Sequence, residues 1–339
     1  MKKLIAIMLA AIMLVSMLVG CSSNKSSEND TPEEPTPSNN SAADDEFMVG
    51  LAFGALDLTP QILSENIIRI CEENGWKYTM TNADQDSSKL LSDVESLCQM
   101  GCDVIICRGI TDDTTAPIID ACYEAGIPLM LLSTYVESMS DKYLTLCNDT
   151  LDAAADMLAE WFQEYIDDHP GEYKVGYVVG DYSLESALCR WTTIRDKTDS
   201  VELVNGEGNW VASDAMSLVE DWLQTYPDMN VICSSSDEMT VGVIQALQDA
   251  GKNPDDFLVL SFDALDVMTE YIEQGWCDAS AGIDLEKQAR TICDICQKVK
   301  DGDTDDIAKV MPAYALYMCT TDNVTAIKNG TVEIDYYIY

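Results

Sequence analysis

The chain has 339 residues, 47% hydrophobic and 8% aromatic, and its 60 acidic against 19 basic side chains give a formal net charge of −41. So acidic a chain repels phosphate backbones and anionic lipid headgroups, which argues strongly against nucleic-acid binding. Nearly half of the residues can be buried, so the chain is not disordered throughout, and its length favours two domains over one.

The first 20 residues have the order of a secretory signal peptide. Lys2 and Lys3 precede an unbroken apolar run over 4–15, which is too short for a settled membrane helix. The sequence Leu18-Val19-Gly20-Cys21 then resembles the bacterial lipobox, in which the cysteine becomes the new N-terminus and carries lipid. We therefore expect a lipoprotein signal peptide over 1–20 and an extracytoplasmic protein anchored to the outer face of the cell membrane by lipidated Cys21. An ordinary signal peptide with a coincidental cysteine is the alternative.

Residues 21–46 predict a flexible linker after the lipid anchor. The segment is rich in serine, proline and acidic residues and has no large apolar side chain that could enter a core. The folded part is therefore expected to begin near Phe47.

From residue 48 onward, short apolar runs alternate with segments of helical periodicity, and Gly75, Gly101 and Gly126 each stand just past a predicted helix. This alternation predicts an α/β fold with parallel sheets covered on both faces. The rhythm restarts after about residue 150, so two series of four strands predict two similar lobes. Strands are expected at 48–54, 77–81, 103–107 and 128–132, then at 174–180, 201–205, 230–234 and 257–262. Helices are expected at 61–74, 88–100, 151–166, 186–197, 212–225 and 238–250.

Ligands of doubly wound sheets bind beyond the carboxyl ends of the strands, so the residues that follow the predicted strands are candidates for a site. They are mostly short, polar and acidic, which suits a small polyhydroxy or amine-bearing ligand. They are Asp57, Arg108, Thr111, Asp112, Ser133, Thr134, Asp181, Tyr182, 234–237 and Asp263.

The cysteines and the single histidine do not predict a metal site. Twelve cysteines follow Cys21, and most lie in apolar runs, where they are typical of small buried hydrophobic residues with free thiols. Cys293 and Cys296 form one C-x-x-C pair without a second, and His169 lies in a polar loop, whereas structural zinc needs four ligands. The acidic run over 301–306 partly imitates a calcium loop but lacks its glycine, so a solvated loop is the better interpretation. We expect no metal and no cofactor.

Four segments carry a resemblance to a known family: VGLAFGALDLTPQILSENIIRICEENGWKY, SDVESLCQMGCDVIICRGITDD, SSSDEMTVGVIQALQDAGK and FLVLSFDALDVMTEYIEQGW. Together they resemble the periplasmic binding proteins of the ribose/galactose type, the type 1 solute receptors of sugar ABC importers, over nearly all of 47–320. The resemblance implies two Rossmann-like lobes joined by a three-crossing hinge. It places the N-terminal lobe at 47–147 plus 284–312 and the C-terminal lobe at 148–283 plus 313–339.

Some family ligand residues carry over to this chain. The resemblance implies that Trp210 is the ring-stacking aromatic, Asp263 the carboxylate that accepts two hydroxyl hydrogen bonds, Asp57 the polar group after the first strand, and Ser236 the position of the family's asparagine.

The chain also departs from the family pattern, and these departures argue against ribose itself as the solute. Thr59 and Pro60 replace paired phenylalanines, and Ile283 replaces the late glutamine, with Asp284 beside it. Thr111 replaces an aspartate for which Asp112 or Asp113 could substitute, and Leu188 aligns with an arginine, with Arg190 two residues on.

Each candidate also has a structural interpretation. Trp210 could be a platform for a sugar ring or plain packing, and Asp263 and Asp57 could hold ligand hydroxyls or cap helices. Arg108 could donate to the ligand or pair with Asp112. Arg190 could contact the ligand or bridge the cleft acids, and Asp237 is expected to cap its helix.

The sequence predicts a monomeric solute-binding protein that captures a small solute, expected to be a sugar, and delivers it to ABC transporter permease subunits. The alternative is a sensory receptor of the same fold that presents its solute to a membrane receptor or binds a non-sugar ligand. An enzyme is not expected, because the chain has no G-x-S-x-G motif, no histidine suitably placed as a base and no glycine-rich phosphate loop.

Overall fold

The computed structural model describes residues 46–329 except 133, 135, 149–150 and 313–315. The predicted signal peptide, Cys21 and the linker up to residue 45 lie outside the described residues, as do Ser133 and residues 330–339. Within the described part, no helix combines the length and apolarity needed to cross a membrane.

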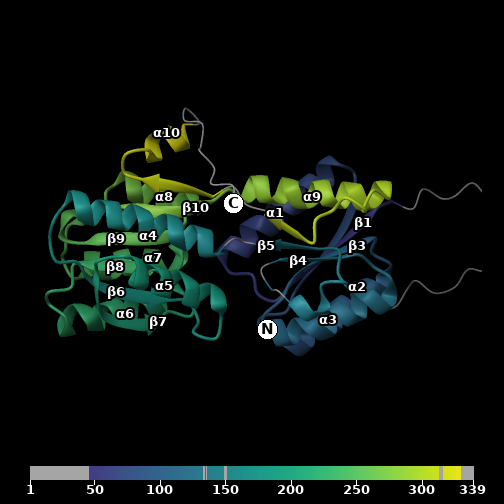
Figure 1. Cartoon of the computed structure of the whole chain (residues 1–339), viewed down its shortest axis with the longest axis horizontal. Helices are drawn as coiled ribbons and strands as arrows, with labels where there is room; N and C mark the ends of the chain where they lie inside the picture. Colours follow the sequence, from purple (N-terminus) through teal and green to yellow (C-terminus); the bar gives the residue numbers. More distant parts are fainter. Residues whose placement is uncertain (1–45, 133, 135, 149–150, 313–315, 330–339) are drawn as a thin grey trace, which may run out of the picture. The chain divides into compact units, whose positions relative to one another are not determined.

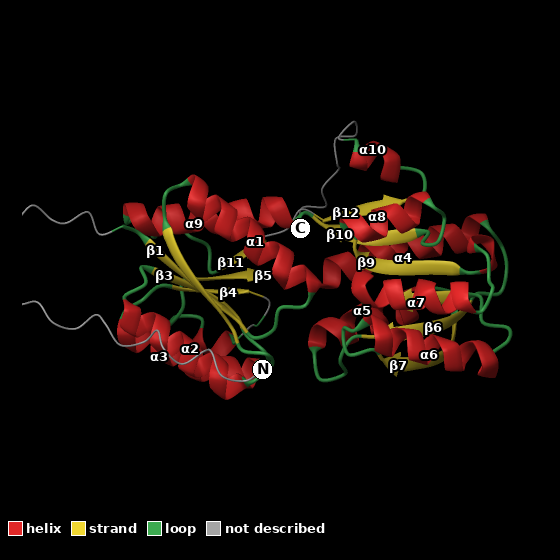
Figure 2. Ribbon diagram, turned by 180° about the vertical axis from the view of Figure 1, so that it is seen from behind, coloured by secondary structure: helices red, strands yellow, loops and turns green. Residues whose placement is uncertain are grey.

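The first sheet has six strands, all paired in parallel, in the order β11–β5–β4–β3–β1–β2. Helices α1 and α9 pack together, as do α2 and α3, and the two pairs cover opposite faces of the sheet (Figures 1 and 2). We call this sheet and these helices the N-terminal lobe. Its strands are β1 (Met48–Phe53), β2 (Lys77–Asn82), β3 (Val104–Arg108), β4 (Leu129–Leu132), β5 (Thr145–Asn148) and β11 (Val310–Pro312); its helices are α1 (Leu58–Glu73), α2 (Ser87–Met100), α3 (Asp112–Ala125) and α9 (Leu285–Asp301).

The second sheet also has six strands, in the order β12–β10–β9–β8–β6–β7, and only the pairing of β10 with β12 is antiparallel among those described. We call this sheet and its helices the C-terminal lobe. Its strands are β6 (Lys174–Val179), β7 (Val201–Glu207), β8 (Val231–Ser234), β9 (Leu258–Asp263), β10 (Ala279–Ile283) and β12 (Leu316–Thr320); its helices are α4 (Leu151–Asp168), α5 (Glu185–Lys197), α6 (Ala212–Thr225), α7 (Asp237–Asp249), α8 (Asp266–Glu273) and α10 (Val324–Lys328).

The chain passes three times between the two sheets: from β5 to α4, from β10 back to α9, and from β11 to β12. The predicted fold class is therefore confirmed. The expectation of four strands per series is wrong, because each sheet gains two strands next to these crossings. Two of the missed strands have a weak apolar signal, because β11 has three residues and β10, with the sequence ASAGI, is rich in small residues.

Glycines end several helices as predicted. Gly101 and Gly126 are the C-caps of α2 and α3, with φ of 77° and 69°. This left-handed backbone is easily adopted by glycine, and the cap N–H groups bond back to carbonyls of the last turn. The chain therefore turns sharply into the next strand at these points.

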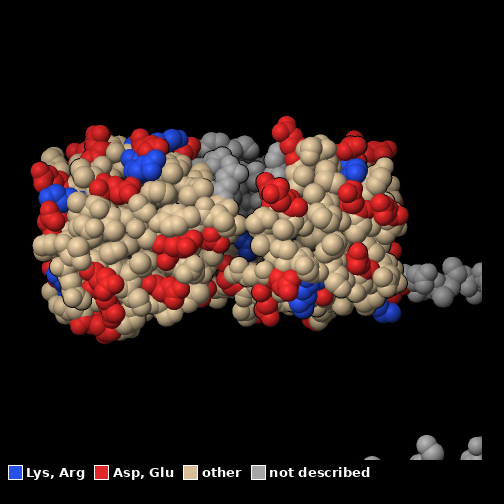
Figure 3. All heavy atoms as spheres, turned by 90° about the horizontal axis from the view of Figure 1, so that it is seen from below, with Lys and Arg blue, Asp and Glu red and all other residues tan. Residues whose placement is uncertain are grey.

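The twelve cysteines after Cys21 are all free thiols, and ten of them are buried. Among the described residues, no group of three or more His, Cys, Asp or Glu side chains is arranged to hold a metal ion. Acidic side chains are spread over the face shown in Figure 3 and outnumber the basic ones there.

Candidate ligand-binding site

A cleft of about 900 Å³ lies between the two lobes and is lined by residues of both. Its lining comes largely from loops that follow the carboxyl ends of parallel strands, where α/β sheets bind ligands. The structure brings all eight candidate site residues into this one lining. They are Asp57, Arg108, Thr111, Asp112, Arg190, Trp210, Ser236 and Asp263.

The N-terminal lobe contributes Asp57 and Arg108. Asp57 stands at the N-cap position of α1, but its side chain makes no capping hydrogen bond. Arg108 ends β3, and its Nη1 lies 3.5 Å from Oδ1 of Asp57. Both side chains are about one-third exposed, so this pair leaves polar atoms available to the cleft.

Thr111 and Asp112 begin α3 on the same wall. Thr111 is the N-cap of α3, where its side-chain oxygen accepts the N–H of Thr114, and Asp112 follows in the first turn. The Thr111 hydroxyl therefore has a structural role in addition to its place in the lining.

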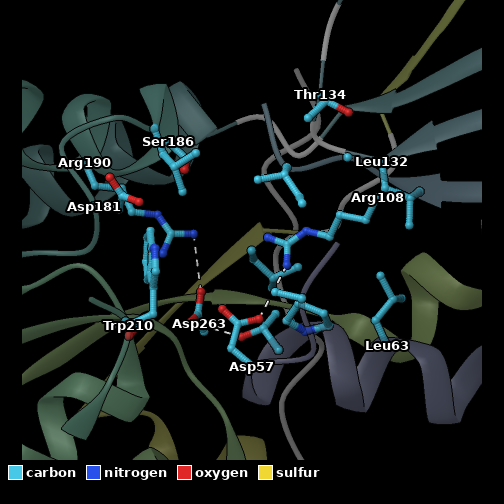
Figure 4. Close-up of a pocket in the computed structure, with 18 of the residues that line it drawn as sticks. Asp57, Leu63, Arg108, Leu132, Thr134, Asp181, Ser186, Arg190, Trp210 and Asp263 are labelled. Atoms are coloured by element: carbon cyan, nitrogen blue, oxygen red, sulfur yellow. Dashed lines mark hydrogen bonds and ion pairs between the residues drawn. The ribbon is translucent and has the colours of Figure 1, made fainter. Parts of the chain in front are cut away.

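The C-terminal lobe contributes a buried ion pair, Arg190 with Asp263. Their Nη2 and Oδ1 atoms are 3.3 Å apart, and the side chains are 8% and 5% exposed. The Arg190 guanidinium also donates to the Ser235 carbonyl and lies 4.7 Å from the centre of the Phe262 ring. Burial raises the pKa of the Asp263 carboxyl, and Arg190 opposes that rise by favouring the charged form. Arg190 thus favours the ionised form of Asp263, the predicted hydrogen-bond acceptor. Figure 4 shows the pair facing the cleft.

Hydrogen bonds also connect the two lobes at the cleft. The Thr59 hydroxyl donates to Oδ2 of Asp263 at 3.2 Å, and the Leu58 N–H lies 3.4 Å from Oε2 of Glu238. In each case a carboxylate of the C-terminal lobe accepts a hydrogen bond from the first turn of α1.

Trp210 lies flat against the backbone of the neighbouring strand end. A Cβ atom on Gly180 would fall 2.2 Å from Cζ2 of the indole, so only glycine leaves room for the ring there. Asn209 and Trp210 both have positive φ, 52° and 61°, so the backbone turns sharply to present the indole. In Figure 4 the indole lies beside Arg190 and Asp263, with Arg108 on the opposite wall.

The prediction that Asp237 caps its helix is wrong, because Ser236 is the N-cap of α7 and its hydroxyl oxygen accepts the Met239 N–H at 3.3 Å. Asp237 is fully buried and accepts hydrogen bonds from Ser261, Ser280 and the Leu265 N–H, the last at 2.6 Å. Asp237 therefore fixes the backbone just after Asp263, whose φ is 101°.

Glu238 and Gln288 are among the polar lining residues that were not singled out from the sequence. Both belong to the first turns of helices and not to the loop directly after a strand. The rule of strand ends does not reach them, although a polar residue in the first turn after a strand-to-helix connection was an available signal.

A model of the periplasmic binding protein domain matches residues 52–304, which is most of the chain. The chain belongs to the periplasmic binding protein family. The predicted resemblance is therefore confirmed, as is the prediction that the chain is not an enzyme, because this family consists of non-catalytic solute-binding proteins.

Curated relatives of this periplasmic binding protein include the ribose import binding protein of Bacillus subtilis, 24% identical over 227 residues, which span 66% of this chain and 72% of the relative. They also include the xylitol-binding protein of Mycolicibacterium smegmatis, 22% identical over 285 residues, which span 79% of this chain and 76% of the relative. The arabinofuranose-bound periplasmic binding protein of the arabinose ABC transporter from Shewanella sp. ANA-3 has the same fold. Its TM-score is 0.76 at 17% identity, covering 84% of this chain and 95% of that one.

Proposed function

We propose that this periplasmic binding protein captures a neutral sugar or polyol between its lobes outside the cell membrane and delivers it to an ABC importer. The observation that carries the proposal is the gathering of one flat aromatic, Trp210, and two Arg–Asp pairs around a single interlobe cleft. The cleft volume of about 900 Å³ lies in the range of about 300–1,000 Å³ that small-molecule sites occupy.

The charges of the cleft favour a neutral, donor-rich solute. Among the described lining residues, seven are acidic and two basic, and both arginines are already paired with aspartates. Carboxylate oxygens accept hydrogen bonds from hydroxyl groups but repel anions. The cleft should therefore prefer sugars and polyols over sugar acids and sugar phosphates.

The two lobes supply a mechanism of capture. The proposed lobes are 47–147 plus 284–312 and 148–283 plus 313–339, except that Asn148 ends β5 in the first sheet. Hinge segments lie at the three crossings. A solute that touches both lobes stabilises the closed arrangement only by its extra affinity for that arrangement. Contacts to Asp57 and Arg108 on one side and to Trp210 and Asp263 on the other supply that extra affinity.

Binding to a defined panel tests the proposal. We expect isothermal titration calorimetry to detect binding of at least one of D-ribose, L-arabinose, xylitol and myo-inositol, and no binding of D-glucuronate or glycerol phosphate. The bound solute should also raise the unfolding temperature, since a ligand at a hundred times its Kd stabilises the native state by about 2.7 kcal/mol. Binding of only the anionic compounds would contradict the proposed solute class, and binding of none of the panel would contradict the proposed function.

A further inference from the structure

Three buried side-chain polar atoms without a hydrogen-bond partner in the described part of the chain belong to the lining of the cleft. They are Oγ1 of Thr134, Nε of Arg190 and Oε1 of Gln288, on residues that are 8%, 7% and 4% exposed. Folded proteins satisfy nearly all of their buried polar atoms, so unpartnered ones at a cleft point to hydrogen bonds that a ligand completes.

Gln288 lies in the first turn of α9, directly after the chain returns to the N-terminal lobe. Asp284 caps this helix by accepting the Lys287 N–H at 2.9 Å, and the apolar neighbours Leu285 and Ala289 are buried. Gln288 therefore lies on the buried side of α9, where an amide group without a hydrogen-bond partner would lower the stability of the folded protein.

The path of α9 carries Gln288 to the ligand-binding edge of the first sheet. Sγ of Cys296 contacts Sδ of Met130 at 4.0 Å, so α9 lies along β4, and it runs antiparallel to that strand because it leads into the parallel strand β11. Gln288 precedes Cys296 by about 12 Å along the helix axis. Only about 7 Å separate Met130 from the end of β4 at Leu132, so Gln288 lies at the carboxyl end of the strands.

We propose that Oε1 of Gln288 accepts a hydrogen bond from a hydroxyl group of the bound solute and so helps to select it. This inference rests on the proposed function. An amide oxygen can only accept, so the ligand group opposite it must be a donor, and neither an ether oxygen nor a carboxylate fills that place. The Nε–H of Arg190 needs an acceptor, and the Thr134 hydroxyl takes either role. A polyhydroxy compound satisfies all three, whereas its deoxy analogue leaves one unpaired.

The variant Gln288→Met keeps the length and volume of the side chain and removes its hydrogen-bonding atoms. In the ligand-free protein we expect an unfolding temperature equal to or above that of the wild type, because Oε1 has no partner in the described protein to lose. For the panel member that binds the wild type best, we expect at least a tenfold loss of affinity. That loss should disappear for the one monodeoxy analogue that lacks the hydroxyl group facing Gln288.

The matched control is Gln297→Met on the same helix. Gln297 is not part of the cleft lining, and its side-chain amide donates to Oδ1 of Asp301 at 2.8 Å. This control should leave the affinity unchanged. Unchanged affinity of Gln288→Met, or an equal loss for the parent sugar and all its deoxy analogues, would overturn the proposal. If the wild type binds no panel member, the proposed function fails separately. The ligand-free measurement still decides the role of Gln288, since a clearly lowered unfolding temperature would show a purely structural one.

Discussion

Trp210 and Gly180 act as one unit in the proposed site. The indole is half-buried, and it rests where a side chain on Gly180 would collide with it. An aromatic face held in this way offers the apolar surface of a sugar ring a flat partner whose conformation is already fixed.

We expect Trp210→Ala and Gly180→Ala each to weaken binding of the best panel sugar by about tenfold or more, which corresponds to about 1.4 kcal/mol. The first change removes the platform, and the second displaces it. Because both act through the same ring, the double variant should lose hardly more than Trp210→Ala alone, and calorimetry on the four proteins checks this.

Two residues of the same lobe serve as controls. Trp191→Ala removes another half-buried indole, which packs on Tyr182 and Arg195, and Gly171→Ala adds a Cβ with no neighbour closer than 3.8 Å. Neither should change the affinity. Additive losses in the Gly180 and Trp210 double variant would show that the two positions act separately.

The sequence was a good guide to cleft residues that follow strands, and it missed some residues placed by helices, such as Gln288. Asp57, Arg108 and Asp263 follow apolar strands, so the rule of strand ends found them. Gln288 depends on the path of α9 along β4 after the chain has returned to the N-terminal lobe, and the rule of strand ends does not include that path. The partner of Arg190 is likewise set by tertiary packing, because Asp263 is 73 residues away in the chain.

At the scale of elements, β10 has few large apolar side chains, and a hydrogen bond to the residue before it helps to fix its position. Asp278 precedes this strand, and its Oδ2 accepts the Val259 N–H of β9 at 2.8 Å. Burial raises the pKa of the Asp278 carboxyl from 3.8 to about 6, while the Val259 hydrogen bond opposes the rise. The start of β10 is therefore fixed by a carboxyl group that ionises less readily in the folded state.

This shift predicts a pH dependence of stability. Between about pH 4 and about pH 6 the folded protein holds the Asp278 proton more tightly than the unfolded chain. Its contribution to the free energy of unfolding is therefore largest below about pH 4 and falls by at most about 3 kcal/mol as the pH rises to about 6. Asp278→Asn keeps an acceptor for Val259 and should remove this decline, as urea unfolding across that range would show.

The exposed Asp249→Asn is the control for charge removal and should leave the pH profile as it is in the wild type. Identical profiles for Asp278→Asn and the wild type would contradict the prediction.

Strands that are long runs of apolar residues were the easiest elements to predict. Strands such as β1 and β9 are runs of buried residues, and the sequence locates them. β11 has three residues, and β10 is built from alanine, serine, glycine and a single isoleucine, so only pairing with neighbouring strands identifies them.

At the scale of the whole molecule, the chain belongs to a family of extracytoplasmic binding proteins. We propose in addition that a lipid anchors it to the membrane. The basis of this proposal is the sequence Leu18-Val19-Gly20-Cys21, which resembles a lipobox. An acyl anchor contributes about 0.8 kcal/mol per buried methylene, so it would hold the protein at the membrane surface.

We expect Cys21→Ser to release the protein from the membrane fraction of a bacterial host and to move it out of the detergent phase. Mass spectrometry of the wild type should find the lipid on Cys21. The control Cys189→Ser, which changes a half-buried thiol of the C-terminal lobe, should stay with the membrane. Retention of the Cys21→Ser protein in the detergent phase would exclude this anchor.

The reaction rate of the buried cysteines with a thiol reagent reports local unfolding of the lobes. Ten of the twelve described thiols are buried, so a disulfide reagent that releases a coloured product can reach most of them only in molecules that have unfolded locally. The speed of colour development therefore reports how often each lobe loosens. A captured solute that clamps the lobes should slow the reaction without any label being added to the chain.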